Sequence, residues 1–238
     1  MTDLGIRFTG RPIERESVLA WEGRRIDAAA RRLRVAAPPP RSVAERRERF
    51  LQQKLNLGAE ELMRRLRRDM TWADRVGRIQ ARASARRRIS RIEINVPAGT
   101  AEEFVGFFET ASAGSDETTM LRACPDHFVI RMASGGQEVL ETTGGSPFAA
   151  FFTIDYDDVG SLVTSPDPAF PFQVAGVARA FDGTSVGGVR HQFRDTHNGF
   201  LARLTVEFPL PTLPSMVSGH RWHLACEFSN WIEESLAR

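Results

Sequence analysis

Residues 211–236 read PTLPSMVSGHRWHLACEFSNWIEESL and predict a long helix at the end of the chain. Its apolar positions recur at helical spacing and share one stripe, at about 100° per residue: Leu213, Val217, Leu224, Phe228 and Trp231. His220 and Glu227 fall near the centre of this stripe, and His223 lies one turn before Glu227. An unpaired carboxylate against a core is costly, so such groups are paired, bound to metal or neutralised. A histidine and a carboxylate four residues apart can bind one metal ion from a single helix.

The segment that precedes this helix has the pattern of a series of strands. Residues 89–96 alternate as a strand, and residues 100–111 predict a short helix that opens with a Thr cap. Strand-like runs follow at residues 117–123, 127–133, 137–143, 149–156, 171–181, 186–195 and 199–208, with a strong hairpin signal at Asn198-Gly199. This element order resembles the helix-grip fold, also called Bet v 1-like or START-like. We therefore expect an α+β protein in which a curved antiparallel sheet surrounds the C-terminal helix and encloses a cavity for an apolar or aromatic ligand.

Charge divides the chain near residue 90. Residues 1–92 hold 23 Arg and one Lys against 11 acidic residues, whereas residues 93–238 hold 8 Arg against 19 acidic residues. Helical patterns cover residues 15–35, 42–55 and the stretch from Gly58 to about residue 85, with a stop at Pro38–Pro40. We expect two parts: an arginine-rich helical extension, residues 1–88, and a helix-grip ligand-binding or catalytic domain, residues 89–238.

The arginine-rich part suggests several partners. Seven of its arginines decorate the third helix and the residues after it: Arg64, Arg65, Arg67, Arg68, Arg86, Arg87 and Arg88. A basic helix can bind nucleic acid through phosphates, but these arginines come without interleaved aromatic residues or a recognised nucleic-acid motif. We favour docking of this face on the acidic half, or on a second copy in a homo-oligomer formed through the N-terminal helices.

Other features set the expected cell compartment. No run of about 18 apolar residues indicates a membrane span, and the first residues lack the apolar core of a secretory signal. Two cysteines, Cys124 and Cys226, do not make a disulfide framework. We therefore expect a cytoplasmic protein with no membrane partner.

His191 is expected to face the cavity. The turn at Asn198-Gly199 fixes the faces of its hairpin and places His191 with apolar neighbours: Val189, Phe193, Phe200, Ala202, Leu204 and Val206. The opposite face is charged and looks solvated. A lone inward histidine is most often a satisfied core residue. Alternatively, it could act as a general acid or base near neutral pH.

His127 and Glu141 flank a second hairpin whose register the sequence leaves open. A three-residue loop over residues 134–136 would place both side chains on one face, and a two-residue loop would place them on opposite faces. Regular alternation groups His127 with Val129 and Arg131, so an exposed histidine at a strand start is the other interpretation.

Together, His127, Glu141, His223 and Glu227 would form a site of two imidazoles and two carboxylates. Such ligands suit zinc, and also manganese or iron. A thiolate site from Cys124, His127, His223 and Cys226 is the alternative, but Cys226 points away from the stripe that carries Glu227. We therefore favour the carboxylate site.

Four segments resemble the diacetylphloroglucinol hydrolase and phloretin hydrolase family: CPDHFVIR at 124–131, VLETTGG at 139–145, HQFRDT at 191–196 and HLACE at 223–227. The resemblance covers about residues 90–236. It implies a Bet v 1-like fold with an added N-terminal region, a zinc ion held by two histidines and two glutamates, and cleavage of the carbon–carbon bond between an acyl group and a polyhydroxylated aromatic ring. His127, Glu141, His223 and Glu227 match the metal positions, with Glu138 as an alternative to Glu141. His191 matches a cavity histidine implicated in catalysis, but the family's catalytic tyrosines have no clear counterparts.

Two functions follow as hypotheses. The first is a metal-dependent hydrolase acting on an acylated polyhydroxy-aromatic ketone, with the aromatic or polyketide-like substrate held by Phe151, Phe152, Phe193, Phe200, His220 and Phe228. The second is a non-catalytic START-like protein that binds an apolar or aromatic small molecule, in which Glu227 pairs with His220, His223 or an arginine and no metal is bound.

Overall fold

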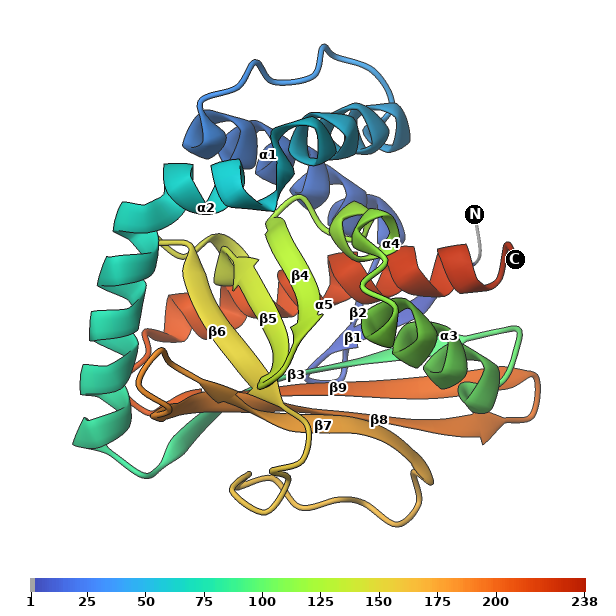
Figure 1. Ribbon diagram of the computed structural model, residues 1–238. Coiled ribbons are helices and arrows are strands. Elements are labelled where there is room, and N and C mark those ends of the chain that lie inside the picture. The colour runs from blue at the N-terminus through green and yellow to red at the C-terminus, as the bar shows by residue number, and fades with distance from the viewer. Residues whose placement is uncertain (1–2) are drawn as a thin grey trace.

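A single antiparallel sheet organises the computed structural model, which describes residues 3–238. Within these residues the sheet has nine strands in the order β2-β1-β3-β9-β8-β7-β6-β5-β4. Their bounds are β1 (Gly5–Phe8), β2 (Arg11–Ile13), β3 (Arg87–Val96), β4 (His127–Ala133), β5 (Gly136–Glu141), β6 (Ala150–Asp155), β7 (Phe172–Arg179), β8 (Ser185–Thr196) and β9 (Gly199–Pro209). In Figure 1, the strands β4, β5 and β6 lie at a steep angle to the long strands β8 and β9, so the sheet is strongly curved.

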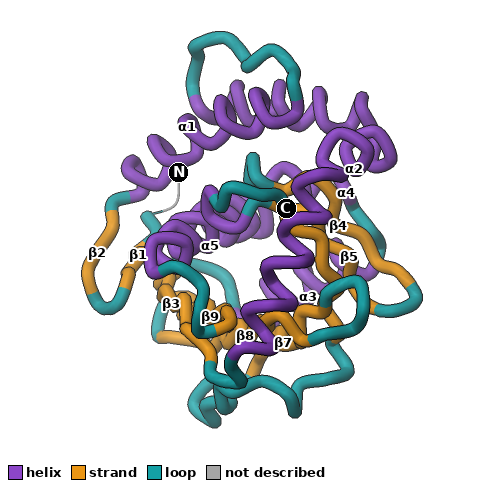
Figure 2. The backbone as a smooth tube through the Cα atoms, turned by 90° about the vertical axis from the view of Figure 1, so that its left-hand side faces the viewer, coloured by secondary structure: helices purple, strands orange, loops and turns teal. Residues whose placement is uncertain are grey.

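The helices pack against this sheet. They are α1 (Arg15–Leu33), α2 (Val43–Ala83), α3 (Ala101–Ala113), α4 (Glu117–Arg122) and α5 (Pro214–Ser235), with a short 3-10 turn, η1 (Thr143–Gly145). Figure 2 shows α1 and the first half of α2 lying over α5, which lies over β3, β9 and β8. Gly58 has φ 73° and ψ 160° and divides α2 into two segments. The second segment then runs down beside β6 (Figure 1).

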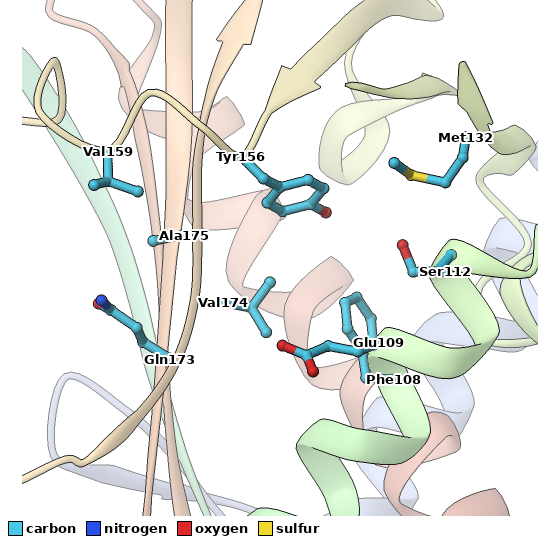
Figure 3. Close-up of a pocket in the computed structure, with 10 residues that line it drawn as sticks. Phe108, Glu109, Ser112, Met132, Tyr156, Val159, Gln173, Val174 and Ala175 are labelled. Carbon is cyan, nitrogen blue, oxygen red and sulfur yellow. The ribbon is translucent and has the colours of Figure 1, made fainter. Parts of the chain in front are cut away.

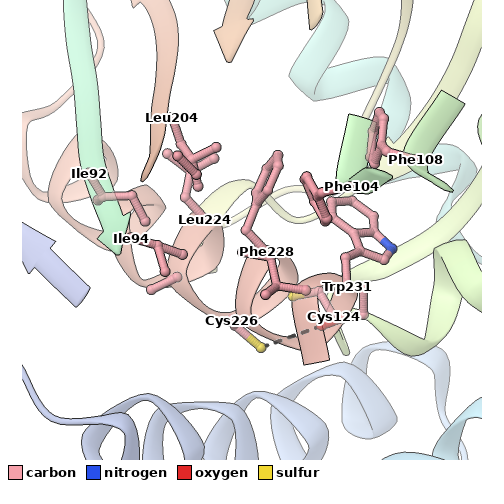
Figure 4. Close-up of a cluster of buried hydrophobic side chains, with 14 of the residues drawn as sticks. Ile92, Ile94, Phe104, Phe108, Cys124, Leu204, Leu224, Cys226, Phe228 and Trp231 are labelled. Carbon is pink, nitrogen blue, oxygen red and sulfur yellow. Dashed lines mark hydrogen bonds between the residues drawn. The ribbon is translucent and has the colours of Figure 1, made fainter. Parts of the chain in front are cut away.

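The main core lies between α5 and the sheet. Leu224, Phe228 and Trp231 of α5 are at most 4% exposed and pack with residues of β3, β9 and α3, as Figure 4 shows. Full burial of each such side chain contributes about 1.5–3 kcal/mol. A second core cluster lies between the outer face of β4 and β5 and the helices α1 and α2, with members that include Phe128, Val129 and Leu140.

The expected α+β class, antiparallel sheet and long C-terminal helix are confirmed. The strand expected at residues 117–123 is wrong, because Asp116 accepts a hydrogen bond from the Thr119 amide at 3.1 Å and caps α4 there. Leu213 is not on the buried stripe: it precedes α5 and is 59% exposed. The sequence also gave no sign of β1 and β2, which extend the sheet from β3.

Several basic side chains of the first 90 residues dock on the second part of the chain. Arg15 pairs with Glu233 at 2.9 Å, Arg25 with Asp126 at 2.6 Å, and Arg78 with Asp182 at 3.0 Å. None of these three arginines belongs to the seven named in the sequence analysis, of which Arg64 and Arg65 pair with Glu61 of the same helix at 2.6 and 2.7 Å, so docking of that face on the acidic half stays a prediction. The division at residue 88, the homo-oligomer and the low expectation of nucleic-acid binding stay predictions. Across residues 3–238, none of the helices combines the length and apolar character that crossing a bilayer requires.

Candidate metal centre

Four buried side chains from three elements converge beneath α1. His127 begins β4, Glu141 ends β5, and His223 and Glu227 lie one turn apart on α5. None is more than 8% exposed. His127 Nε2 lies 3.2 Å from His223 Nε2 and 3.0 Å from Glu227 Oε2. Glu141 Oε2 lies 3.8 Å from His127 Nε2 and 3.5 Å from His223 Nε2, which is itself 3.5 Å from Glu227 Oε2.

A β-bulge explains how His127 reaches this cluster. The β4–β5 hairpin has a two-residue loop, because Ala133 pairs with Gly136, and regular pairing would put His127 and Glu141 on opposite faces. The register shifts between His127 and Val129, so that His127 pairs with Glu141. Phe128 and Val129 consequently both pack on the side of α1 and α2, in the second core cluster. The extra residue turns the His127 side chain inward.

The hydrogen bonding of His127 suits metal binding. Its Nδ1 lies 3.0 Å from the carbonyl oxygen of Met120, to which it can only donate. The neutral ring then carries its proton on Nδ1 and has a free lone pair on Nε2, the atom that faces the other three side chains. Ligand histidines in proteins are commonly oriented by such a bond from the second ring nitrogen.

The spacing of the four atoms fits one small cation. Zinc lies about 2.1 Å from nitrogen and oxygen ligands, so tetrahedral ligand atoms are about 3.4 Å apart. The five separations given above range from 3.0 to 3.8 Å. These five separations, which leave out the Glu141–Glu227 pair, are close to the spacing of ligand atoms around one small cation.

Cys124 provides a second ligand combination. Cys124, His127 and His223 form a buried group that could hold a metal ion, with one ligand atom from each within 4.8 Å of the others. The Cys124 sulfur lies 3.8 Å from His223 Nδ1, on the opposite side of the ring from Nε2. Burial raises the pKa of the Cys124 thiol, with Cys226 and nearby carboxylates adding to the effect. Cys226 Sγ lies 3.7 Å from the carbonyl oxygen of Ala123.

The cluster is electrostatically coupled. Burial opposes charge on His223, but the carboxylates of Glu141 and Glu227 outweigh it and raise the pKa of His223 well above its usual value. Burial likewise opposes charge on the two carboxylates, but His223 and His127 together outweigh it and lower the pKa of both. The arrangement therefore favours two ionised carboxylates with positive charge between them, which an imidazolium or a divalent ion can supply.

The N-terminal helices hold the loop that carries His127. The Lys54 ammonium of α2 is fully buried and donates to the carbonyls of Leu121, Cys124 and His127 at 2.8, 3.2 and 2.8 Å. Arg25 of α1 forms two hydrogen bonds to Asp126, at 2.6 and 2.8 Å. The sequence showed these residues only as part of a basic segment, because their partners are about 70 and 100 positions away.

A small inner cavity adjoins the cluster. It has a volume of about 70 Å³ and is lined by His127, Glu141 and Glu227 together with His191, Phe152 and Phe228, among others. His191 is therefore on the inward face, as expected. Its Nδ1 accepts a hydrogen bond from the Thr205 amide at 3.3 Å, and its ring lies 4.8 Å from that of Phe228. Burial lowers the pKa of His191 to about 4, with Glu227 opposing the shift.

Tyr156 is a cavity residue that the sequence analysis did not select. It lines both the inner cavity and a more open surface pocket of about 400 Å³ beside α3, and Figure 3 shows it facing Ser112 and Met132 across that pocket. Its hydroxyl donates to Gln137 at 2.9 Å, and Gln137 donates to Ser112 at 2.6 Å. Alternation of Phe152 and Ile154 along β6, continued by Tyr156 directly after the strand, was the signal that could have found it.

The other residues expected to hold a substrate divide between different places. Phe152 and Phe228 line the inner cavity. Phe193 and Phe200 lie in the core instead, with ring centroids 5.4 and 5.6 Å from that of Phe104 on α3, a helix whose packing the sequence pattern did not specify. Phe151 and His220 line a separate cavity beside α2. Glu138, the alternative to Glu141, pairs with Arg131 at 2.8 Å and takes part in none of the contacts given above for the cluster.

No protein-family model matches the sequence, and no curated protein does either. Solved structures do match, and one of them is the crystal structure of Ara h 8.0201. It is 14% identical with a TM-score of 0.41, and the match covers 64% of this chain and 100% of that one. A likeness at this level carries no inference about residues.

Proposed function

We propose that this protein is a metal-dependent hydrolase that cleaves the carbon–carbon bond between an acyl group and a polyhydroxylated aromatic ring. The observation that carries the proposal is the convergence of His127, Glu141, His223 and Glu227 at separations that fit one tetrahedral cation. The order of strands and helices supports a helix-grip, Bet v 1-like fold. The sequence resemblance to the diacetylphloroglucinol and phloretin hydrolases supports the reaction.

Zinc is the metal that we favour, with manganese or iron as alternatives, and His127, Glu141, His223 and Glu227 are the proposed ligands. Such an ion would supply a Lewis acid for a ketone carbonyl and would lower the pKa of water. The set with the Cys124 thiolate is less favoured, because burial raises the pKa of that thiol.

His191 is the proposed catalytic residue of the inner cavity. Hydrolysis leaves the hydroxyl of water on the acyl carbon and a proton on the ring carbon. With a pKa of about 4, His191 is neutral at pH 7, and because Nδ1 accepts from Thr205 its proton is on Nε2. We therefore favour a role in orienting the attacking water by donating a hydrogen bond, rather than in protonating the ring carbon.

Metal content tests the proposal directly. Wild type purified without added metal should hold about one zinc per chain, and His223→Ala and Glu227→Ala should lose it. The exposed His197 and Glu16 provide matched controls, His197→Ala and Glu16→Ala, which should keep the metal. Elemental analysis with circular dichroism separates metal loss from unfolding, and full zinc in both folded site variants would reject the site.

Activity tests the reaction. The loaded protein should convert a mono-acylated trihydroxybenzene into the free carboxylic acid and the deacylated ring, detected by chromatography. His191→Ala should reduce kcat while zinc content stays the same. Turnover equal to that of wild type in this variant would remove His191 from the proposal.

A non-catalytic binder of an apolar or aromatic molecule is the second candidate. It is favoured by the raised pKa of His223, because an imidazolium between Glu141 and Glu227 neutralises the cluster without an ion. Equimolar metal in protein purified without added ions would count against it.

A further inference from the structure

A second cavity approaches the cluster from the side of α2. It has a volume of about 310 Å³ and lies between the second half of α2, strands β6–β9 and the start of α5, where Figure 1 shows α2 descending beside β6. Residues on its wall include Ala73, Gly77, Phe151, Phe152, Met216 and His220. Val76 and Leu213, also on the wall, are 40% and 59% exposed, so the cavity opens to solvent between α2 and α5.

This cavity ends at the proposed metal centre. Glu141 lines both it and the inner cavity, so the two spaces meet at a proposed ligand. His220 of the cavity wall stacks on His223, with ring centroids 5.4 Å apart and planes at 11°. A molecule that fills the cavity would therefore present one end to the cluster.

The charges on the wall indicate an uncharged occupant. Asp74 is already paired with Arg78 at 2.7 Å and also accepts the Phe181 amide. Glu207 accepts the amides of Val163 and Thr164, at 3.1 and 2.7 Å. The carboxylates of the wall, apart from Glu141, are thus committed to partners within the protein, and aromatic and aliphatic side chains make up most of the remaining wall.

The two cavities differ in volume. A volume of about 70 Å³ has room for a few waters or a small acyl group. A volume of about 310 Å³ is at the lower end of the range that ring-containing ligands occupy. We infer that the α2-walled cavity binds an uncharged ring, so that the larger, ring-bearing half of the substrate lies beneath α2 and the smaller acyl half lies in the inner cavity.

The inference deepens the proposed function but does not need the metal for its test. The neutral fluorophore N-phenyl-1-naphthylamine is titrated into metal-loaded protein and into protein treated with a chelator. Ala73→Trp fills the cavity from α2. Ala83→Trp, at an exposed position on the same helix, is the matched control, and Ala113→Trp fills the competing pocket beside α3.

Wild type and Ala83→Trp should bind the probe at one site, and Ala73→Trp should bind it about tenfold more weakly or worse, since it loses the apolar contacts of a ring. Ala113→Trp should match wild type. Equal affinity in Ala73→Trp, loss of binding only in Ala113→Trp, or no saturable binding to wild type would each overturn the inference. Binding with this pattern in wild type that takes up no metal, either during purification or on addition of zinc, would support the cavity and reject the proposed hydrolase.

Discussion

Lys54→Met should destabilise the protein by about 3 kcal/mol at pH 7. The change keeps an apolar stem of similar length but removes the ammonium that donates to three buried carbonyls. Each carbonyl left without a donor costs about 2 kcal/mol, or about 6 kcal/mol together. Burial lowers the pKa of Lys54 from 10.5 to about 8, so the charge is unfavourable in the folded state. Removing this charge therefore offsets about 3 kcal/mol of the loss.

The effect should grow with pH. Lys54 is protonated up to about pH 10.5 in the unfolded chain but only to about pH 8 in the folded one. Between these values the unfolded state binds more protons, so wild-type stability rises with pH in this window, and the variant lacks this contribution. The difference between wild type and Lys54→Met should therefore widen by about 2 kcal/mol between pH 7 and about pH 9.5.

Urea unfolding of the metal-free proteins at both pH values measures these quantities. Arg49→Met, at an exposed position of α2, is the control and should change stability by less than about 0.5 kcal/mol. A chelator competition in parallel should show weaker zinc binding by Lys54→Met, because the His127 carbonyl loses a partner. A loss below about 0.5 kcal/mol at pH 7, or a difference that does not widen with pH, would refute the reasoning.

Three further results are expected. Cys124→Ala should keep its zinc in elemental analysis, and loss of the ion would instead indicate the thiolate ligand set. Zinc affinity should fall up to about tenfold per pH unit as pH decreases below the raised pKa of His223, because the ion displaces the proton on that imidazole. Competition with a chelator at several pH values measures the zinc affinity. An affinity that does not change with pH would contradict the prediction. Gly144→Ala should lower the stability measured by urea unfolding far more than Gly10→Ala does. Both glycines have positive φ, but only at Gly144 would a Cβ overlap the His220 backbone. Similar losses in both variants would argue against the close approach of η1 and α5.

The features that the sequence predicted best are those with local periodicity. The helical stripe around Leu224 and Phe228 and the Asn198-Gly199 hairpin each depend on a few neighbouring residues, so α5 and the β8–β9 pair were within reach. The same hairpin fixed the inward face of His191. These assignments need no knowledge of distant contacts.

The features that the sequence did not predict depend on tertiary contacts. Residues 117–123 alternate like a strand, but the cap at Asp116 and burial of the segment against β4 and α2 select a helix. β1 is only four residues long and is stabilised by pairing with β3, more than 80 positions away. Lys54 resembled any other basic residue of its helix, because the carbonyls that it binds come together only after folding.

The bulge in β4 means that the ligand set depends on the number of residues before the hairpin as well as on their identity. A chain lacking Phe128 could form an uninterrupted ladder in which His127 still pairs with Glu141, whereas a regular ladder that kept Phe128 would turn the imidazole toward α2. A shift of the β4 register by one residue would thus separate the four ligands while every one of them remained in the sequence. Relatives that share these residues but differ in length at this position should be sorted by spacing before any chemistry is assigned to them.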